Sequence, residues 1–494
     1  MRVYPSVKLY SFTVQVTKSV KLSNTVVKTY KFEIFTATIE KNIREGIFKP
    51  GHKLPSVREL KAQYKTSIST IQNGYEHLVI LGLVESVPKS GYYVSNRPEV
   101  VKQAPKPRLR PVVRDAIFKH HLGLTTSLRA GRKLSEFNVA APGDLLMPQK
   151  LLLRTMQQVI REQGAGLLHY YPSNGGATLK ASIVKRAAAH QSILHPDELV
   201  VTDGALQALY IALTAVCNAG DVVAVESPCV FSALEVIRVL QLKVIEIPVD
   251  PLTGFDVDFL KKACHNTPVK AVIITPNFHN PTGLSLTQEQ QLALLSIAQQ
   301  HHIAVIENDI YGDLHFHGPR PSTIRRFDDS GLVLTYASYA KTLAPGIRLG
   351  WLSAGKFMQR AEQVKFALGS TVSPLYQETV NKLLAGSSYD RHVRAFRMQL
   401  ARNAHFAIHL LSAHFPKKTA IITPAGGYNL WVKLPEHVDM THFYAQCEKI
   451  GIRFTPGSTF SFSGTFDKHF RLVFADKFFP KKIEAIKLLG KRLR

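Results

Sequence analysis

The sequence predicts an α/β protein in which a small winged helix-turn-helix precedes a large domain with a mostly parallel, doubly wound sheet. Two patterns and the chain length support this prediction. Short helical patterns followed by a hairpin pattern occupy residues 30–96. From residue 135 to the end, apolar runs of strand length alternate with helical patterns. The 494 residues, 45% of them hydrophobic, exceed one ordinary domain and can bury a large core.

Residues 30–96, which we call the head, begin with a predicted helix, "KFEIFTATIEKNIREGIF", that ends at Gly46. Its apolar residues recur at helical spacing: Ile34, Phe35, Ile39 and Ile43. A second helix opens in "LPSVREL". There Ser56 is the expected N-cap, and Glu59 stands three residues later, which is the spacing of a capping box.

"SISTIQNGYEHLVILGLV" predicts a third helix with Ile71, Tyr75 and Leu78 on one face and Gly82 at its end. "LVESVPKSGYYVS" predicts two short strands around a Lys-Ser-Gly tip. Helices joined by a tight turn and followed by a β-wing are typical of a winged helix-turn-helix, whose third helix would enter the major groove of DNA. The spacing also permits a small helical adaptor that binds protein instead of DNA.

The overall charge favours a polyanionic partner. The formal net charge is +26, and lysines or arginines that meet phosphates release counterions. By itself, this charge supports a basic surface without a specific partner about equally well. The four cysteines have neither a paired spacing nor a nearby histidine cluster, so we expect a reducing cytoplasm and no metal site. We expect no membrane segment and assign no role to residues 1–29, which lack the apolar block of a signal peptide.

A linker is predicted over residues 97–134. Prolines and basic residues alternate closely in "RPEVVKQAPKPRLRPVV", and such a composition stiffens a chain without forming a helix. Its lysines and arginines either lie along DNA or are simply solvated.

Residues 135–494 are predicted to form the large α/β domain. Its strands are expected at "ELVVTDG", "VVAVESP", "KVIEIP", "KAVIITP", "IAVIEND", "LVLTYAS" and "LGWLSA". Ligands of such sheets bind beyond the carboxyl ends of the strands, so polar residues that follow these runs are candidates for a site.

Polar residues do follow the runs in order: Asn280 in "TPNFHNPTG", Asp309 and Tyr311 in "IENDIYGD", Ser338 and Lys341 in "TYASYAK", and then Arg348. Each has an ordinary structural explanation as a turn, capping or surface residue. Their occurrence behind successive strands instead favours a common site. Gly204, Ala205 and Leu206 open a helix after a strand, where free backbone N–H groups can hold an anion.

These side chains match the chemical needs of pyridoxal 5′-phosphate (PLP). A lysine with a lowered pKa, such as Lys341, forms a Schiff base with its aldehyde. A carboxylate, such as Asp309, keeps its pyridine nitrogen protonated. Asn280 and Tyr311 offer donors to the phenolic oxygen. The turn at Ala205, with Ser338 and the planar guanidinium of Arg348, suits the phosphate.

The head resembles the GntR-type winged helix over "GIFKPGHKLPSVREL", "SISTIQNGYEHL" and "GLVESVPKSGYYV". The resemblance implies that Arg58 contacts phosphate or base edges. It also implies a reading helix with Ser69, Thr70 and Asn73, and a wing tip at Ser90 and Gly91. The family often has an arginine where Ile68 stands, so one expected DNA contact is missing.

From "NVAAPGDLLMP" onward, the chain resembles the fold-type I aminotransferases of class I and II. The motifs are "HNPTG", "ENDIYGDL", "SYAKTLAPGIRLGW", "PAGGYNLWVKLP", "TPGSTF" and "HFRLVFA". The resemblance implies that Lys341 carries PLP and shuttles protons, and that Arg471 pairs with the α-carboxylate of an amino acid. It also implies an obligate head-to-tail homodimer in which Tyr170 reaches the partner's phosphate. Here Phe231, one place after Val230, stands near the position of the ring-stacking aromatic, and Leu179-Lys180 replaces the family's Leu-Arg.

Together the two halves resemble the MocR-type transcriptional regulators. This resemblance implies that the protein binds a DNA operator and that its PLP domain senses an amino compound. An active aminotransferase that carries an accessory DNA-binding domain is the alternative, because every catalytic residue type is present.

Overall fold

The computed structural model describes residues 31–80, 83–87, 90–95, 110–118, 135–369 and 371–493. The predicted N-terminal extension and much of the predicted linker lie outside these residues. The chain divides into two units, Met1–Ala104 and Pro105–Arg494, at a point inside the predicted linker. Each unit is described by itself.

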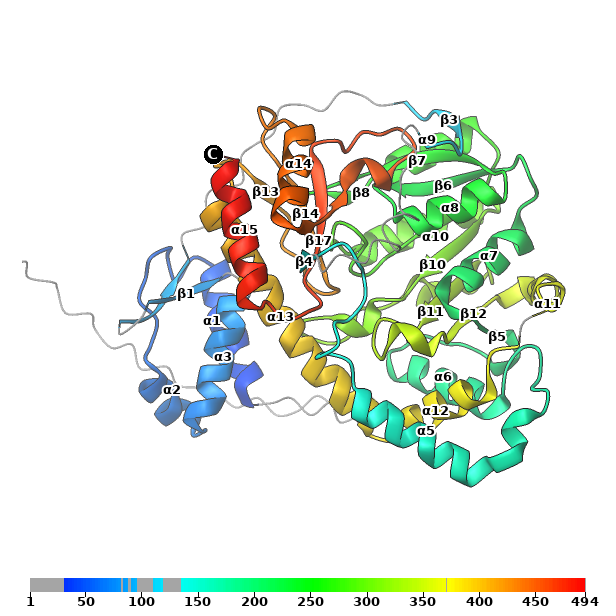
Figure 1. Ribbon diagram of the computed structural model, residues 1–494, viewed down its shortest axis with the longest axis horizontal. Coiled ribbons are helices and arrows are strands. Elements are labelled where there is room, and N and C mark those ends of the chain that lie inside the picture. The colour runs from blue at the N-terminus through cyan, green and yellow to red at the C-terminus, as the bar shows by residue number, and fades with distance from the viewer. Residues whose placement is uncertain are drawn as a thin grey trace, which may run out of the picture. The chain divides into compact units, whose positions relative to one another are not determined.

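The first unit contains the elements predicted for the head (Figure 1): α1 (Lys31–Arg44), α2 (Val57–Tyr64), α3 (Ile68–Ile80), and the antiparallel strands β1 (Val84–Val87) and β2 (Gly91–Val94). The capping box is confirmed, because the Ser56 hydroxyl accepts from the Glu59 N–H and the Glu59 carboxylate accepts from the Ser56 N–H. Helix α2 ends at Lys65, whose φ of 45° is left-handed and turns the chain toward α3.

A small apolar core holds the first unit together. The face predicted for α3 is confirmed, since Ile71, Tyr75 and Leu78 are all fully buried against Phe35 of α1. The rings of Tyr75 and Tyr92 stack 4.0 Å apart, so the hairpin is fixed to α3. Gly82, the predicted end of the helix, lies outside the described residues.

The second unit is built on a nine-stranded sheet with the order β3-β7-β6-β9-β10-β11-β12-β5, in which β8 also pairs with β7. The strands are β3 (Val113–Asp115), β5 (Leu199–Thr202), β6 (Val222–Ser227), β7 (Lys243–Asp250), β8 (Gly254–Phe255), β9 (Val269–Ile274), β10 (Ala304–Asn308), β11 (Val333–Ser338) and β12 (Gly350–Ser353). Strands β7, β6, β9, β10 and β11 run parallel, and β12 is antiparallel to both of its neighbours. The predicted mostly parallel sheet is therefore confirmed.

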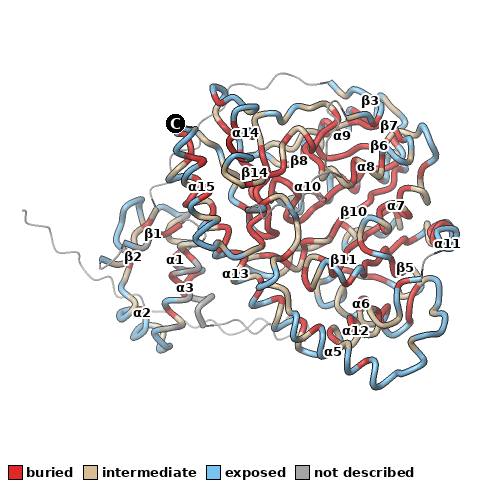
Figure 2. Tube along the Cα trace, in the orientation of Figure 1, coloured by how far each residue is buried: buried red, intermediate tan, exposed pale blue. Residues whose placement is uncertain are grey.

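Helices cover both faces of this sheet, which explains why its central strands are buried (Figure 2). One face packs against α7 (Gly204–Val216), α8 (Phe231–Val239) and α11 (Met358–Ala367). The other packs against α9 (Val257–Asn266) and α10 (Gln288–His301). Beside β5 and β12, a further core is formed by α5 (Gln149–Gln163), α6 (Ala177–Ala189) and α12 (Pro374–Ala385).

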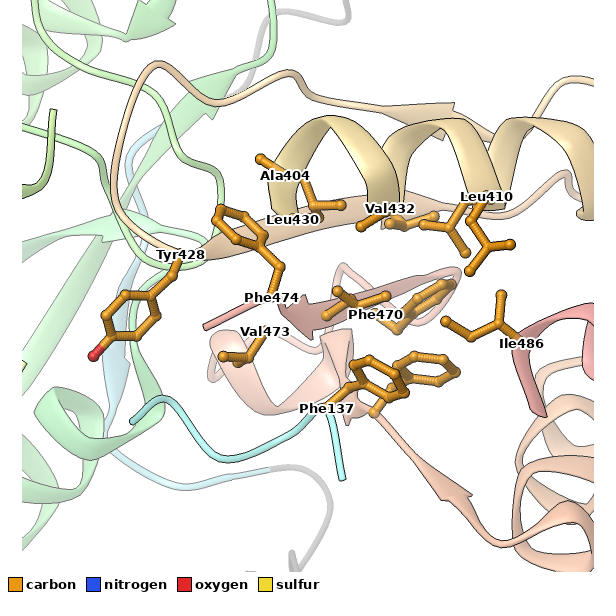
Figure 3. Close-up of a cluster of buried hydrophobic side chains, with 14 of the residues drawn as sticks. Phe137, Ala404, Leu410, Tyr428, Leu430, Val432, Phe470, Val473, Phe474 and Ile486 are labelled. Atoms are coloured by element: carbon orange, nitrogen blue, oxygen red, sulfur yellow. The ribbon is translucent and has the colours of Figure 1, made fainter. Parts of the chain in front are cut away.

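The predicted smaller C-terminal subdomain is also confirmed. Its sheet has the order β13-β14-β17-β16, with β13 (Ala420–Ile421), β14 (Asn429–Lys433), β16 (Thr455–Pro456) and β17 (His469–Val473). A second, two-stranded sheet joins β15 (Ile452–Arg453) to β4 (Ser135–Glu136). The helices are α13 (Ser388–His414), α14 (Met440–Ile450) and α15 (Pro480–Arg492). Their shared core places Phe470 and Phe474 of the β17 segment between α13 and Phe137 (Figure 3).

The described residues contain no helix that is both long and apolar enough to span a bilayer. They also contain no group of three or more side chains arranged to hold a metal ion. All four cysteines are unpaired and buried.

Candidate functional site

The order of the strands brings the predicted site residues together at the carboxyl ends of the central strands. Strands β9, β10 and β11 are adjacent and parallel, so their carboxyl ends meet. Asn280 lies in the loop after β9. Asp309 directly follows β10, Ser338 is the last residue of β11, and Lys341 stands three residues later.

The surroundings of Lys341 favour the neutral form of its amine, which is the nucleophilic form. Burial, together with the positive charges of Arg471 and Arg348, lowers the pKa of its amine to about 8. The Nζ atom donates to the Ala140 carbonyl oxygen at 2.5 Å, and the Tyr428 hydroxyl donates to the same oxygen at 3.3 Å. A larger fraction of this amine than of an ordinary lysine is therefore neutral near physiological pH and able to attack a carbonyl carbon.

Asp309 is buried, and its two carboxylate oxygens have different surroundings. Oδ2 is ion-paired with Arg320, whereas Oδ1 has no hydrogen-bond partner. Burial raises the pKa of Asp309, and the charge of Arg320 together with a side-chain hydrogen bond from Asn277 opposes this rise. An unpartnered buried acceptor is rare in folded proteins, so Oδ1 is a place for a donor on a bound ligand.

Arg471 is a fully buried cation that forms no ion pair within the described part of the chain. Its Nη1 donates to Asn280 Oδ1 at 3.0 Å, and its Nη2 donates to the Asn138 carbonyl at 2.6 Å and to Thr455 Oγ1 at 3.1 Å. Its Nε has no partner, and burial lowers its pKa to about 10. A buried guanidinium held only by neutral acceptors favours a carboxylate ligand.

Asn280 connects the guanidinium of Arg471 to the hydroxyl of Tyr311. Its Nδ2 donates to the hydroxyl of Tyr311 at 3.4 Å, while its Oδ1 faces Arg471. In the same loop, the buried His279 approaches Glu226 of β6 to 3.3 Å between Nε2 and Oε2. The fixed loop allows Asn280 to contact two groups at once.

The side chain of Arg348 contacts the turn at Gly204 that is predicted to bind an anion. Helix α7 begins at Gly204, whose φ is +77°, and Arg348 donates to the preceding Asp203 carbonyl at 2.9 Å. The left-handed φ of Gly204 favours glycine, and a Cβ atom there would lie 2.7 Å from the end of the Arg348 side chain. Ala205 is half-buried and Leu206 exposed, and both present first-turn backbone N–H groups.

Three other predicted residues have distinct environments. The Ser338 hydroxyl donates to the Leu349 carbonyl at 3.1 Å and accepts from the Ala340 N–H. The Phe231 ring lies 5.7 Å from the Arg471 guanidinium carbon and contacts Phe460 edge-on. Tyr170 is fully exposed and does not reach the site.

The predicted DNA-contacting residues lie on the first unit. Arg58 is exposed on α2. The Thr70 hydroxyl pairs with that of Ser67 at 2.7 Å at the start of α3, and the Ser90 hydroxyl pairs with that of Tyr93 at 2.6 Å at the hairpin tip. Gly91 has a φ of +118°. The backbone of Ser69 and Asn73 lies in α3, and their side chains lie outside the description.

Sequence reasoning did not identify several residues of the site. They are Asn138, Ala140, Arg320, Tyr428 and Thr455. Two of them contribute only a backbone carbonyl, which carries no side-chain signal. Arg320 stands 11 residues after Asp309, where nothing local marks it as a partner.

Comparison with known proteins identifies the two halves of the chain. The model described as "Bacterial regulatory proteins, gntR family" matches residues 35–94, and "Aminotransferase class I and II" matches residues 141–477. The chain is 34% identical over 463 residues to the uncharacterized HTH-type transcriptional regulator YjiR of Escherichia coli K12, covering 93% of this chain and 98% of that one. It is 27% identical to the HTH-type transcriptional regulator NorG of Staphylococcus aureus, covering 86% and 95%.

Solved structures with the same fold are aminotransferases. The kynurenine aminotransferase of Pyrococcus horikoshii, solved with PMP, KYN and KYA, has a TM-score of 0.69 at 23% identity and covers 75% of this chain and 93% of that one. LysN, an α-aminoadipate aminotransferase from Thermus thermophilus complexed with N-(5′-phosphopyridoxyl)-L-leucine, has a TM-score of 0.70 at 24% identity, covering 76% and 95%. These likenesses establish the fold of the second unit.

Proposed function

The chain belongs to the HTH-type transcriptional regulators of MocR-type architecture, in which a GntR winged helix is joined to an aminotransferase class I and II domain, and from this membership we propose its function. It is a DNA-binding regulator whose aminotransferase-like domain holds PLP and senses an amino compound or PLP itself. The observation that carries the proposal is the presence of a lysine with a lowered pKa and an unpartnered carboxylate oxygen in a chain that also contains a winged helix.

The residues of the site fit PLP. The free Oδ1 of Asp309 suits a protonated ring nitrogen, and the Arg348–Gly204 turn suits a phosphate. When bound, PLP supplies an aldehyde that lysines and amino acids attack and a ring that withdraws electrons. Lys341 would hold the aldehyde carbon, and Asn280 and Tyr311 would donate to the phenolic oxygen. Arg471 would orient the carboxylate of an amino acid, with Phe231 beside it.

We propose that the working unit is a cytoplasmic homodimer. Tyr170 is fully exposed in a single subunit, as expected of a side chain that serves the phosphate site of a partner. Two heads would then contact two half-sites of an operator. The length of DNA that the protein protects tests this dimer proposal, since two heads on two half-sites protect a longer stretch than one head can cover.

DNA binding is tested by selecting fragments of genomic DNA with the purified full-length protein, with and without PLP. We expect enrichment of a defined operator whose affinity depends on PLP. Equal recovery of all fragments in both conditions would contradict the proposal.

A working aminotransferase is the second candidate, and it is supported by the contacts of Asn280 with both Tyr311 and Arg471 and by the lowered pKa of Lys341 beside Arg471. Sustained formation of 2-oxo acids from a panel of amino acids, without operator binding, would favour the enzyme. A single turnover that stops with the cofactor converted would favour the sensor.

Arg58→Ala is expected to weaken operator binding. Arg58 is exposed on the capped helix α2, and an exposed arginine at a phosphate contributes through counterion release. We expect the slope of log affinity against log salt to fall by about 1. Lys41→Ala is the control, because Lys41 is equally exposed but paired with Glu45 within α1. An unchanged slope for Arg58→Ala would contradict its assignment.

Within the second unit, the linker contacts the segment next to Arg471. Strand β3 of the predicted linker pairs with β7 and forms the edge of the sheet, and the Phe118 ring lies 4.7 Å from the ring of Phe462. Phe460, two residues earlier, lies 5.3 Å from the Arg471 guanidinium. We propose that this segment transmits occupancy of the carboxylate site to the linker.

Phe118→Ala is expected to reduce the change in operator affinity that an amino acid causes, while amino-acid binding itself stays unchanged. Coupling free energies are typically about 1 to 3 kcal/mol, which corresponds to a five- to 150-fold effect on operator affinity. We expect Phe118→Ala to remove most of that effect. Ile117→Ala is the matched control, because Ile117 is the adjacent residue and 70% exposed. A full response in Phe118→Ala would rule out this route.

A further inference from the structure

A buried charge network lies behind Asp309. Arg320 uses every part of its guanidinium: Nη2 pairs with Asp309 Oδ2, Nε donates to Asp313 Oδ1 at 2.8 Å, and Nη1 donates to the Pro321 carbonyl at 3.3 Å. Its side chain is only 10% exposed. A Cβ atom at Gly312 would overlap both Asp309 Oδ1 and the Arg320 guanidinium, so the glycine leaves room for this pairing.

Asp313 anchors the network from the other side. One of its oxygens accepts from Arg320, and Oδ2 accepts from Arg186 Nη2 and from the Tyr389 hydroxyl, both at 3.0 Å. Burial favours the neutral form, but Arg186 and Arg320 hold the pKa of Asp313 well below its usual range. Asp313 is therefore a permanent anion that holds Arg320 in one orientation.

The same network reaches the residue beside Lys341. Tyr389 lies 2.9 Å from the Thr342 hydroxyl. A phenol has one proton, and the Asp313 carboxylate is the stronger acceptor, so Tyr389 donates to Asp313 and accepts from Thr342. The backbone that carries Lys341 and the carboxylate that faces the ring nitrogen are thus fixed by one buried anion.

The pairing of Arg320 is asymmetric in a way that points to function. An arginine that served stability alone could bind both oxygens of Asp309 through its planar fork. Arg320 instead divides its donors between two carboxylates and leaves Asp309 Oδ1 without a partner. Oδ1 therefore stays available to a ligand, while Arg320 neutralises the charge on Oδ2.

We propose that Arg320 is a positioning residue that keeps Asp309 ionised and aimed, so that Oδ1 receives the ring nitrogen of PLP, with Asp313 holding Arg320 in place. This inference rests on the proposed PLP site. It implies that removing the Arg320 charge raises the pKa of Asp309 further and favours its neutral form, which is a weaker partner for a protonated ring.

The test compares Arg320→Gln, Arg320→Lys and Arg325→Gln as full-length proteins, by titrating each with PLP across a pH series. Arg325 is the matched control, because its side chain is also 10% exposed and ion-paired, but with Glu198 and Asp328. We expect Arg320→Gln to raise the Kd for PLP by about tenfold or more, the change that one pKa unit represents. The loss should shrink as the pH rises, because Asp309 then ionises without help.

Arg320→Lys should recover part of the affinity and pH profile of the unsubstituted protein, and Arg325→Gln should match that protein in both. Thermal melts report the folding of each variant. If Arg320→Gln does not fold, Asp313→Asn replaces it, with a smaller rise in Kd expected. Unaltered PLP affinity and pH profile in Arg320→Gln would overturn this inference alone. An unsubstituted chain that takes up no PLP would overturn the proposed function and this inference with it.

Discussion

Replacing Lys341 with alanine is expected to abolish covalent capture of PLP completely. Lys341 is the amine at the carboxyl edge of the sheet whose pKa is lowered to about 8, and Arg471 and Arg348 repel its protonated form. Alanine has no amine, so the visible absorbance of bound cofactor and its trapping by borohydride should both disappear. Non-covalent binding through the Arg348–Gly204 turn can remain.

The pH dependence of capture adds a quantitative check. Only the neutral amine attacks an aldehyde, so the rate of capture should rise about tenfold per pH unit below pH 8 and level off above it. Lys356→Ala is the control, because Lys356 is an exposed lysine in the same unit. Borohydride labelling that persists in Lys341→Ala would show that another amine carries the cofactor.

Replacing Arg471 with alanine is expected to cause the second-largest loss, in the affinity for amino acids. Truncating one partner of a buried, hydrogen-bonded charge pair costs about 2 to 5 kcal/mol, or from about 30-fold to several thousandfold. The substitution also leaves Asn280 Oδ1 and Thr455 Oγ1 without their donor, which lowers the stability of the fold. PLP binding should persist, because none of these contacts involves the proposed phosphate turn.

A pair of ligands makes this prediction specific. The unsubstituted protein should prefer an amino acid over the matching amine that lacks the carboxylate, and Arg471→Ala should lose that preference. Arg471→Lys keeps a cation without the planar fork, so it should retain the fold and recover part of the preference. An Arg471→Ala protein that still discriminates the two ligands would show that the carboxylate binds elsewhere.

Much of the architecture could be predicted because its signals are local. The capping box of Ser56 and Glu59 spans one helical turn, and the face of Ile71, Tyr75 and Leu78 follows from helical periodicity alone. Strand lengths and Pro-Gly loops likewise placed Asn280, Asp309 and Lys341 after strands. Adjacent parallel strands then required these three residues to share an edge.

The environment of those residues could not be predicted in the same way. The acceptor of Lys341 is a carbonyl 201 positions away, and one acceptor of Arg471 is 333 positions away. A backbone oxygen has no residue signature, and its position depends on how the C-terminal subdomain packs. The lowered pKa of Lys341 depends on burial and on the charges of Arg471 and Arg348.

The sequence by itself therefore determined the elements, their order and the residue types that meet at the strand ends, since these follow from periodicity, capping and chain direction. Only the tertiary structure decided that Arg320 holds one oxygen of Asp309 and leaves the other free. Only it decided that the linker adds a strand to the sheet edge beside β7. Both depend on through-space contacts between segments that no local pattern connects, and such contacts set the electrostatics of the site.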